Sequence, residues 1–177
     1  QALNRKIKKG DWVHLGAAPK RDGLTSCIRR SVIAGIKEDE FTKEQKYWFD
    51  FIEQAYNVGY NAYKEISEKN LPAKFQEQAL VDFFASKSEE VSKMIGKKVQ
   101  LEKLKPYTGT HNSGYTECQE FYGAITLESE EPLENQVVTM LDVALRGFGN
   151  MWNDVIIPNF DYIVIENLQQ FLVQDVP

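Results

Sequence analysis

Two long amphipathic stretches, separated by a proline, place the strongest constraint on how this chain can fold. Thr42 and Gln45 fit a capping box, in which each side chain accepts a hydrogen bond from the backbone of the other residue at a helix start. Apolar residues then recur at helical spacing until Pro72, which cannot continue a helix. A second stretch of the same kind follows directly. The short link predicts an antiparallel helix hairpin over about 42–69 and 73–95.

Shorter elements are expected on both sides of the hairpin. Thr25 or Ser26 can cap a helix at about 27–36. Helical spacing predicts a further helix at 133–152, and a last helix or strand is expected at 168–173. The sequence therefore predicts an α+β fold, in which the helix hairpin packs with a small, mostly antiparallel sheet and one further C-terminal helix, at 133–152. Polar loops are expected at 17–23 and 106–118. Alternating or β-branched residues predict strands at 11–15, 97–103, 121–127, 155–157 and 162–165.

Length and composition predict one globular domain over 1–177, with a basic N-terminal arm at about 1–10. The chain is 42% apolar and 27% charged, as globular proteins commonly are. No apolar run approaches the roughly 18 residues that a membrane-spanning helix needs, and no apolar stretch follows the charged opening as in a signal peptide. These features favour a soluble protein of the cytoplasm or of a virion, with no membrane partner, and leave secretion open.

Charge is divided unevenly along the chain. Residues 1–37 carry nine Lys or Arg against two Asp or Glu, a net of +7. Residues 106–177 carry one against eleven, a net of −10, whereas the segment between them is nearly balanced. Two explanations stay open: the two ends compensate each other within the fold, or the basic end meets an anionic partner.

A thiol nucleophile is the first candidate for catalysis. Cys27 is expected at the start of a helix, where the helix dipole lowers the pKa of a thiol, and two arginines follow it. His111 lies in a polar loop, a placement that suits a general base. No local signature of a cysteine enzyme surrounds either residue, so the alternative is a packed cysteine and a surface histidine.

Metal and carboxylate chemistry find less support. Cys27, Cys118, His14 and His111 lack the paired spacing of zinc ligands, so we expect no metal and no cofactor. Glu166 follows a hydrophobic run but lacks the nearby lysine of a nuclease-like motif. No phosphate-binding loop, dinucleotide fingerprint, serine-hydrolase elbow or HExxH motif occurs.

Binding residues are expected at the basic end and in the loop around His111. Clustered cations with an aromatic side chain suit contacts to phosphates, but the acidic pI of about 5.2 argues against a dedicated nucleic-acid-binding domain. Another protein, or copies of this chain, are therefore the expected partners. The candidate binding residues are Arg5, Lys6, Lys8, Lys9, Trp12, Lys20, Arg21, Arg29, Arg30, Tyr107, His111 and Tyr115.

These observations predict a non-enzymatic protein-interaction or assembly module that uses the basic N-terminal segment and the acidic C-terminal third. The absence of familiar motifs suggests a viral structural protein or a bacterial-conflict protein. One alternative is a small cysteine-dependent hydrolase with Cys27 as nucleophile and His111 as base. A second is nucleic-acid contact through the basic segment.

Overall fold

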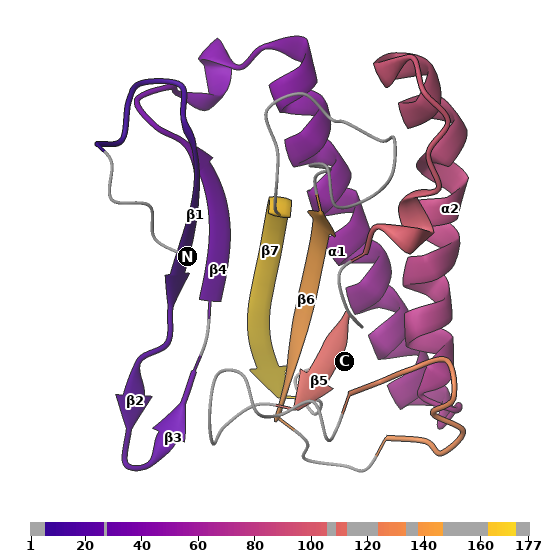
Figure 1. The fold of residues 1–177 in the computed structure, drawn as a ribbon. Coiled ribbons are helices and arrows are strands. Elements are labelled where there is room, and N and C mark those ends of the chain that lie inside the picture. The colour runs from indigo at the N-terminus through magenta and orange to yellow at the C-terminus, as the bar shows by residue number, and fades with distance from the viewer. Residues whose placement is uncertain are drawn as a thin grey trace.

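A five-stranded antiparallel sheet with two long helices packed on one face forms the framework of the chain (Figure 1). The computed structural model describes residues 6–26, 28–105, 109–112, 124–133, 138–146 and 163–172. In chain order its elements are β1 (Trp12–Ala17), β2 (Lys20–Arg21), β3 (Leu24–Thr25), β4 (Ile28–Ile33), the 3-10 turn η1 (Glu38–Glu40), α1 (Lys43–Lys69), α2 (Lys74–Ile95), the 3-10 turn η2 (Leu101–Lys103), β5 (Thr110–Asn112), β6 (Val138–Arg146) and β7 (Ile163–Leu172).

The helix hairpin forms where the sequence predicts it. The capping box is present, with Gln45 N–H donating to Thr42 Oγ1 at 3.1 Å and Thr42 N–H donating to Gln45 Oε1 at 2.9 Å. The first helix, α1, ends at Asn70 and α2 ends at Gly96, both with positive φ, the left-handed conformation that commonly closes a helix. The helices α1 and α2 run antiparallel side by side (Figure 1). Buried apolar side chains from both helices join one core cluster.

The sheet has the strand order β1-β4-β7-β6-β5, so β1 and β5 lie at its edges. The pairing of the strands places residues that are far apart in the sequence directly opposite one another, in one row across the sheet. Arg29 of β4 is opposite Leu168 of β7, and Leu168 is opposite Asp142 of β6. Strands β2 and β3 form a separate small hairpin that extends from β1 and β4.

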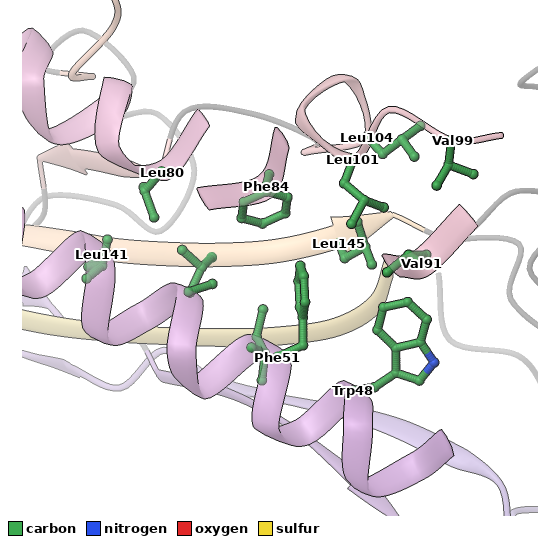
Figure 2. Packing of buried hydrophobic residues seen from close by; sticks show 13 residues of the cluster. Trp48, Phe51, Leu80, Phe84, Val91, Val99, Leu101, Leu104, Leu141 and Leu145 are labelled. Atoms are coloured by element: carbon green, nitrogen blue, oxygen red, sulfur yellow. The ribbon is translucent and has the colours of Figure 1, made fainter. Parts of the chain in front are cut away.

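The main core lies between the two helices and β6, and Figure 2 shows its side chains converging from these elements. Burial of this apolar surface is the main stabilising term for such a sheet-and-helix packing. The cluster comprises Trp48, Phe51, Ile52, Ala55, Leu80, Phe84, Val91, Val99, Leu101, Leu104, Leu141, Val143 and Leu145.

The helix predicted at 27–36 is wrong, because residues 28–33 form strand β4. Ile28, Val32 and Ile33 are β-branched, and such side chains favour strands. Backbone pairing with β1 on one side and β7 on the other fixes this segment in the sheet, and tertiary pairing outweighs a local capping signal.

The helix predicted at 133–152 is also wrong over residues 138–146, which form β6. The spacing of its apolar residues fits both the helical period of 3.6 residues and the strand period of two. The step of four between Leu141 and Leu145 suits one face of a helix, but Val143 completes an alternation that points the same residues to one side of a strand. In the structure Leu141, Val143 and Leu145 all join the core beneath the helices.

The strand predicted at 97–103 is replaced by an irregular segment and η2. Its backbone donors bond to α2 instead of to a strand: Val99 N–H donates to Ser92 Oγ at 2.8 Å, and Leu101 N–H donates to Ser88 Oγ at 2.9 Å. Serine hydroxyls can replace a ladder partner in this way.

Other local predictions have mixed outcomes. Residues 124–127 are not a strand, whereas 110–112 within the expected loop form β5. The predicted strand at 11–15 is confirmed as β1, and 163–172 form one strand, β7. The strand predicted at 155–157 lies outside the described residues.

The α+β class is confirmed, with the helix hairpin packed on a small antiparallel sheet. The single-domain organisation and the basic arm at 1–10 stay predictions. In the described part of the chain, neither helix is long and apolar enough to cross a membrane.

Candidate functional site

A buried ion pair joins α2 to the segment that leads into β5. Oε1 of Glu77 lies 2.6 Å from Nζ of Lys105, and each side chain is only 6% exposed. The other carboxylate oxygen of Glu77 accepts a hydrogen bond from Gly109 N–H at 3.0 Å. A single carboxylate thus ties both ends of segment 105–109 to the helix. We call this arrangement the Glu77 clamp.

Local sequence explains why the clamp forms here. Glu77 lies in the first turn of α2, where the helix dipole favours a negative charge. It precedes Leu80 by three residues and therefore shares the buried face of the helix. Gly109 fits against this face only because it lacks a side chain, since a Cβ atom there would collide with Leu80 Cδ1.

Burial and neighbouring carboxylates act in opposite directions on Lys105. Burial is the larger effect and lowers the pKa of the Lys105 ammonium, whereas the negative charges of Glu77 and Asp142 oppose that shift. Lys105, Glu77 and Asp142 therefore act on one another electrostatically and form one unit.

Asp142 also lies near a cation that is carried by strand β4. Its Oδ2 lies 3.8 Å from Nη1 of Arg29. The Asp142 side chain is 3% exposed and the Arg29 side chain is 25% exposed. Charges of opposite sign therefore follow one another from Glu77 and Lys105 to Asp142. The last of them is the guanidinium of Arg29, which is partly exposed to solvent.

His111 belongs to the same face of the sheet as Asp142. Its neighbour Thr110 is opposite Leu141, whose side chain packs beneath the helices, so His111 and its partner Met140 lie on the face away from them. Asp142 is two residues beyond Met140, which makes it a diagonal neighbour of His111 at roughly 7–8 Å between Cα atoms. The His111 carbonyl accepts a hydrogen bond from Thr139 Oγ1 at 3.0 Å, and the residue is 4% exposed.

We call Arg29, Asp142 and His111 the sheet-face group. Together they offer a guanidinium, a carboxylate and an imidazole on one face of the sheet. Arg29 is the member of the set that a ligand can reach from solvent, whereas Asp142 and His111 are 3% and 4% exposed behind it. Among the residues that the structure describes, no group of three or more His, Cys, Asp or Glu could hold a metal ion.

Two further polar side chains are buried on the helix side of the sheet. Gln76 and Thr110 are fully buried, and neither amide atom of Gln76 nor the hydroxyl of Thr110 has a hydrogen-bond partner within the described ranges. Buried water commonly satisfies such groups. The interior next to the Glu77 clamp is therefore more polar than the rest of the core.

The structure brings together only part of the residue set that the sequence singled out. Arg29 and His111 are in the sheet-face group, and Arg30 donates to the Arg29 carbonyl at 2.7 Å. Trp12 instead stacks on Phe49 of α1 with ring centroids 5.3 Å apart. Lys6, Lys8, Lys9, Lys20 and Arg21 are exposed. Arg5, Cys27, Tyr107 and Tyr115 lie outside the described residues.

The strands next to Cys27 and His111 indicate how far apart this proposed catalytic pair is. Ile28 and Thr110 occupy one row of the sheet, on strands β4 and β5. Because β7 and β6 lie between these strands, the two backbones are roughly 14 Å apart. Cys27 itself lies outside the described residues.

Sequence reasoning missed Glu77, Lys105 and Asp142. Asp142 is the only charged residue in the apolar run 137–145, and that isolation was a usable signal of a buried, partnered carboxylate. Glu77 could have been found by its place on the apolar stripe of α2. Lys105 carried no such signal, because its burial depends on the path of the chain after η2.

The structure is an α+β fold with a buried charge network, and solved structures share this fold. Prolidase from Pyrococcus furiosus matches with a TM-score of 0.61 and 15% identity, over 97% of this chain and 43% of that one. Icp55 from Saccharomyces cerevisiae, bound to the inhibitor apstatin, gives a TM-score of 0.64 at 18% identity, over 96% and 41%.

The N-terminal domain of the FACT complex subunit SPT16 from Eremothecium gossypii matches with a TM-score of 0.65 at 10% identity, over 100% of this chain and 36% of that one. This chain spans about two fifths of the length of the solved structures that it matches. No protein-family model matches the sequence, and no curated protein matches it. At these identities the likeness establishes the fold.

The comparison corrects the functional prediction made from the sequence. An assembly module of viral or bacterial-conflict origin is contradicted, because the structural neighbours are prolidases and other peptidase-like proteins, together with a domain of a FACT complex subunit. The likeness also gives no support to a cysteine-dependent hydrolase or to nucleic-acid contact. The sequence prediction failed because it relied on missing motifs and on charge, neither of which reports a fold.

Proposed function

We propose that this chain is part of a peptidase-type protein whose ligands are short peptides. The observation that carries the proposal is the agreement in fold with a prolidase and with dipeptidases over 96–97% of the chain. The names of those proteins indicate dipeptides as substrates, and a chain that spans two fifths of their length can supply part of a comparable site.

The sheet-face group supports a peptide ligand on chemical grounds. A short peptide carries an ammonium at one end and a carboxylate at the other. Arg29, whose side chain is 25% exposed, can pair with the carboxylate in a two-pronged geometry, and the buried Asp142 beside it holds the guanidinium in place. His111 is buried on the same face as Asp142, so its placement acts on the ligand through Asp142 and Arg29.

The proposed ligand is consistent with one of the partners expected from the sequence. Another protein can present such a peptide as its chain terminus, so a protein partner stays a proposal. A copy of this chain also stays a proposal, but no described contact favours it over a short peptide.

The test measures binding and cleavage by the full chain. Calorimetric titration with apstatin follows binding, and chromatography of a dipeptide panel that includes X-Pro peptides follows cleavage, with and without added divalent cations. We expect saturable binding of apstatin, weakened at least about tenfold in Arg29→Met because the exposed guanidinium donor of the sheet-face group is lost.

Arg21→Met is the matched control for this titration. Arg21 is also a cation of the N-terminal region, but its side chain is 94% exposed in the β2–β3 hairpin. We expect the control to bind apstatin like the wild type. The proposal fails if the wild type neither binds apstatin nor cleaves any dipeptide, or if Arg21→Met weakens binding as much as Arg29→Met.

A further inference from the structure

The Glu77 clamp holds the backbone that leads into His111. Gly109 is fixed on both sides: its N–H donates to Glu77 Oε2 at 3.0 Å, and its carbonyl accepts from Asp142 N–H at 2.6 Å. Only Thr110 separates this glycine from His111. The entry of the chain into β5 is thus held by one side-chain contact from α2 and one backbone contact from β6, just before the ladder with β6 begins at Thr110.

We propose that Glu77 is a positioning residue, which places His111 in the sheet-face group by fixing the Gly109 peptide. The proposal rests on the proposed function, because it makes peptide binding depend on a helix residue on the far side of the sheet from the ligand. A site residue must be held within about 0.5 Å of its productive place. Strand β5, with only three residues, gains this precision from the clamp.

The geometry distinguishes the two contacts of Glu77. Its hydrogen bond to Gly109 N–H can position the backbone, whereas its ion pair with Lys105 neutralises a buried charge. A glutamine at position 77 keeps an acceptor oxygen of similar reach, but leucine has none. Removing both charges at once avoids the cost of a lone buried charge, which would otherwise obscure the result.

The experiment therefore compares two charge-free double variants. Glu77→Gln with Lys105→Met retains an acceptor for Gly109 N–H, and Glu77→Leu with Lys105→Met removes it. The first readout is the NMR signal of the His111 ring. The chain has two histidines, so His14→Gln leaves His111 as the single histidine signal. The second readout is the dissociation constant of apstatin.

We expect the glutamine variant to keep the His111 signal and the apstatin affinity of the wild type. We expect the leucine variant to shift that signal and to bind apstatin about tenfold more weakly, as when a residue that orients a ligand-binding side chain is lost. Thermal unfolding of both variants checks that they are folded. A merely structural role would lower the unfolding temperature without separating the two variants in either readout.

A matched control uses an exposed pair on the same helix. Lys93 Nζ lies 2.6 Å from Glu89 Oε1, with side chains 76% and 81% exposed. Glu89→Gln with Lys93→Met should leave both readouts unchanged. Equal His111 signals in the two Glu77 variants would overturn the positioning role. Because the His111 signal needs no ligand, it decides the matter even if apstatin does not bind and the proposed function fails.

Discussion

The guanidinium of Arg29 lies 3.8 Å from the carboxylate of Asp142, although strand β7 separates the two strands that carry them. The register explains how they meet, since both residues are in one row with Leu168 between them. Long side chains can span one intervening strand on the same face of a sheet. This contact links the basic N-terminal region to the acidic C-terminal part of the chain within a single fold.

Replacing Arg29 by methionine should destabilise the protein by about 1–3 kcal/mol. The change leaves Asp142 buried with one of its cations missing, and a buried carboxylate without its partner is costly. Urea unfolding followed by circular dichroism measures the change. The control is Arg21→Met, whose ion pair with Asp22 is almost fully exposed and should contribute within about 0.5 kcal/mol. Equal effects of the two substitutions would contradict a stabilising role for the Arg29–Asp142 pair.

Loss of the capping box should weaken the start of α1. Thr42→Ala removes the acceptor for Gln45 N–H and should cost about 1 kcal/mol in the free energy of unfolding. Lys43→Ala changes an exposed residue at the first helical position and serves as the control, with an expected effect within about 0.5 kcal/mol. Chemical denaturation of both variants tests this, and a Thr42→Ala variant as stable as the control would refute it.

The helix hairpin could be read from the sequence because its signals are local. The capping box at Thr42, the break at Pro72 and the glycine after α2 each act within a few residues. The strands could not be placed as well. Strand β4 depends on pairing with β1 and β7, and β6 has an apolar spacing that suits either a helix or a strand.

The candidate site was only half predictable for a related reason. Arg29 and His111 were singled out by residue type, but their connection runs through Asp142, which lay in a segment expected to be helical. Glu77 and Lys105 are 28 residues apart in sequence, and only the turn of the chain after η2 brings them together. Long-range contacts of this kind leave no local pattern in a single sequence.

Gly59→Ala should destabilise α1 even though alanine is the better helix former. A Cβ atom at this position would lie 3.0 Å from Leu141 Cδ1 and 3.1 Å from Leu80 Cδ2, closer than packed side chains normally approach. Overpacking should lower the free energy of unfolding by about 1–3 kcal/mol, which exceeds the gain of about 1 kcal/mol from the higher helix propensity of alanine.

The control for Gly59→Ala is Asn57→Ala, at an exposed position of the same helix. There alanine should stabilise the protein by a few tenths of a kcal/mol, because only helix propensity changes. Thermal and urea unfolding measure both variants. If Gly59→Ala proves as stabilising as Asn57→Ala, the close approach of α1 to α2 and β6 is not a packing constraint.

The buried phenol of Tyr63 should make stability fall in alkaline solution. Burial raises the pKa of Tyr63 from 10.0 to about 12, and a hydrogen bond with Thr139 opposes the shift. Above pH 10 the unfolded chain releases this proton while the folded protein retains it. The free energy of unfolding therefore decreases between pH 10 and about 12, whereas below pH 10 this group contributes no pH dependence.

Tyr63→Phe removes this titrating group and should flatten that decrease. Urea unfolding at a series of pH values from neutral to alkaline gives the slope for both proteins. Burial also raises the pKa of Tyr47 to about 12, so the variant should lose part of the slope and keep the part that comes from Tyr47. Ultraviolet titration of tyrosinate gives an independent check, because one late-titrating phenol should disappear. An unchanged slope in Tyr63→Phe would show that this phenol ionises equally in the folded and unfolded protein.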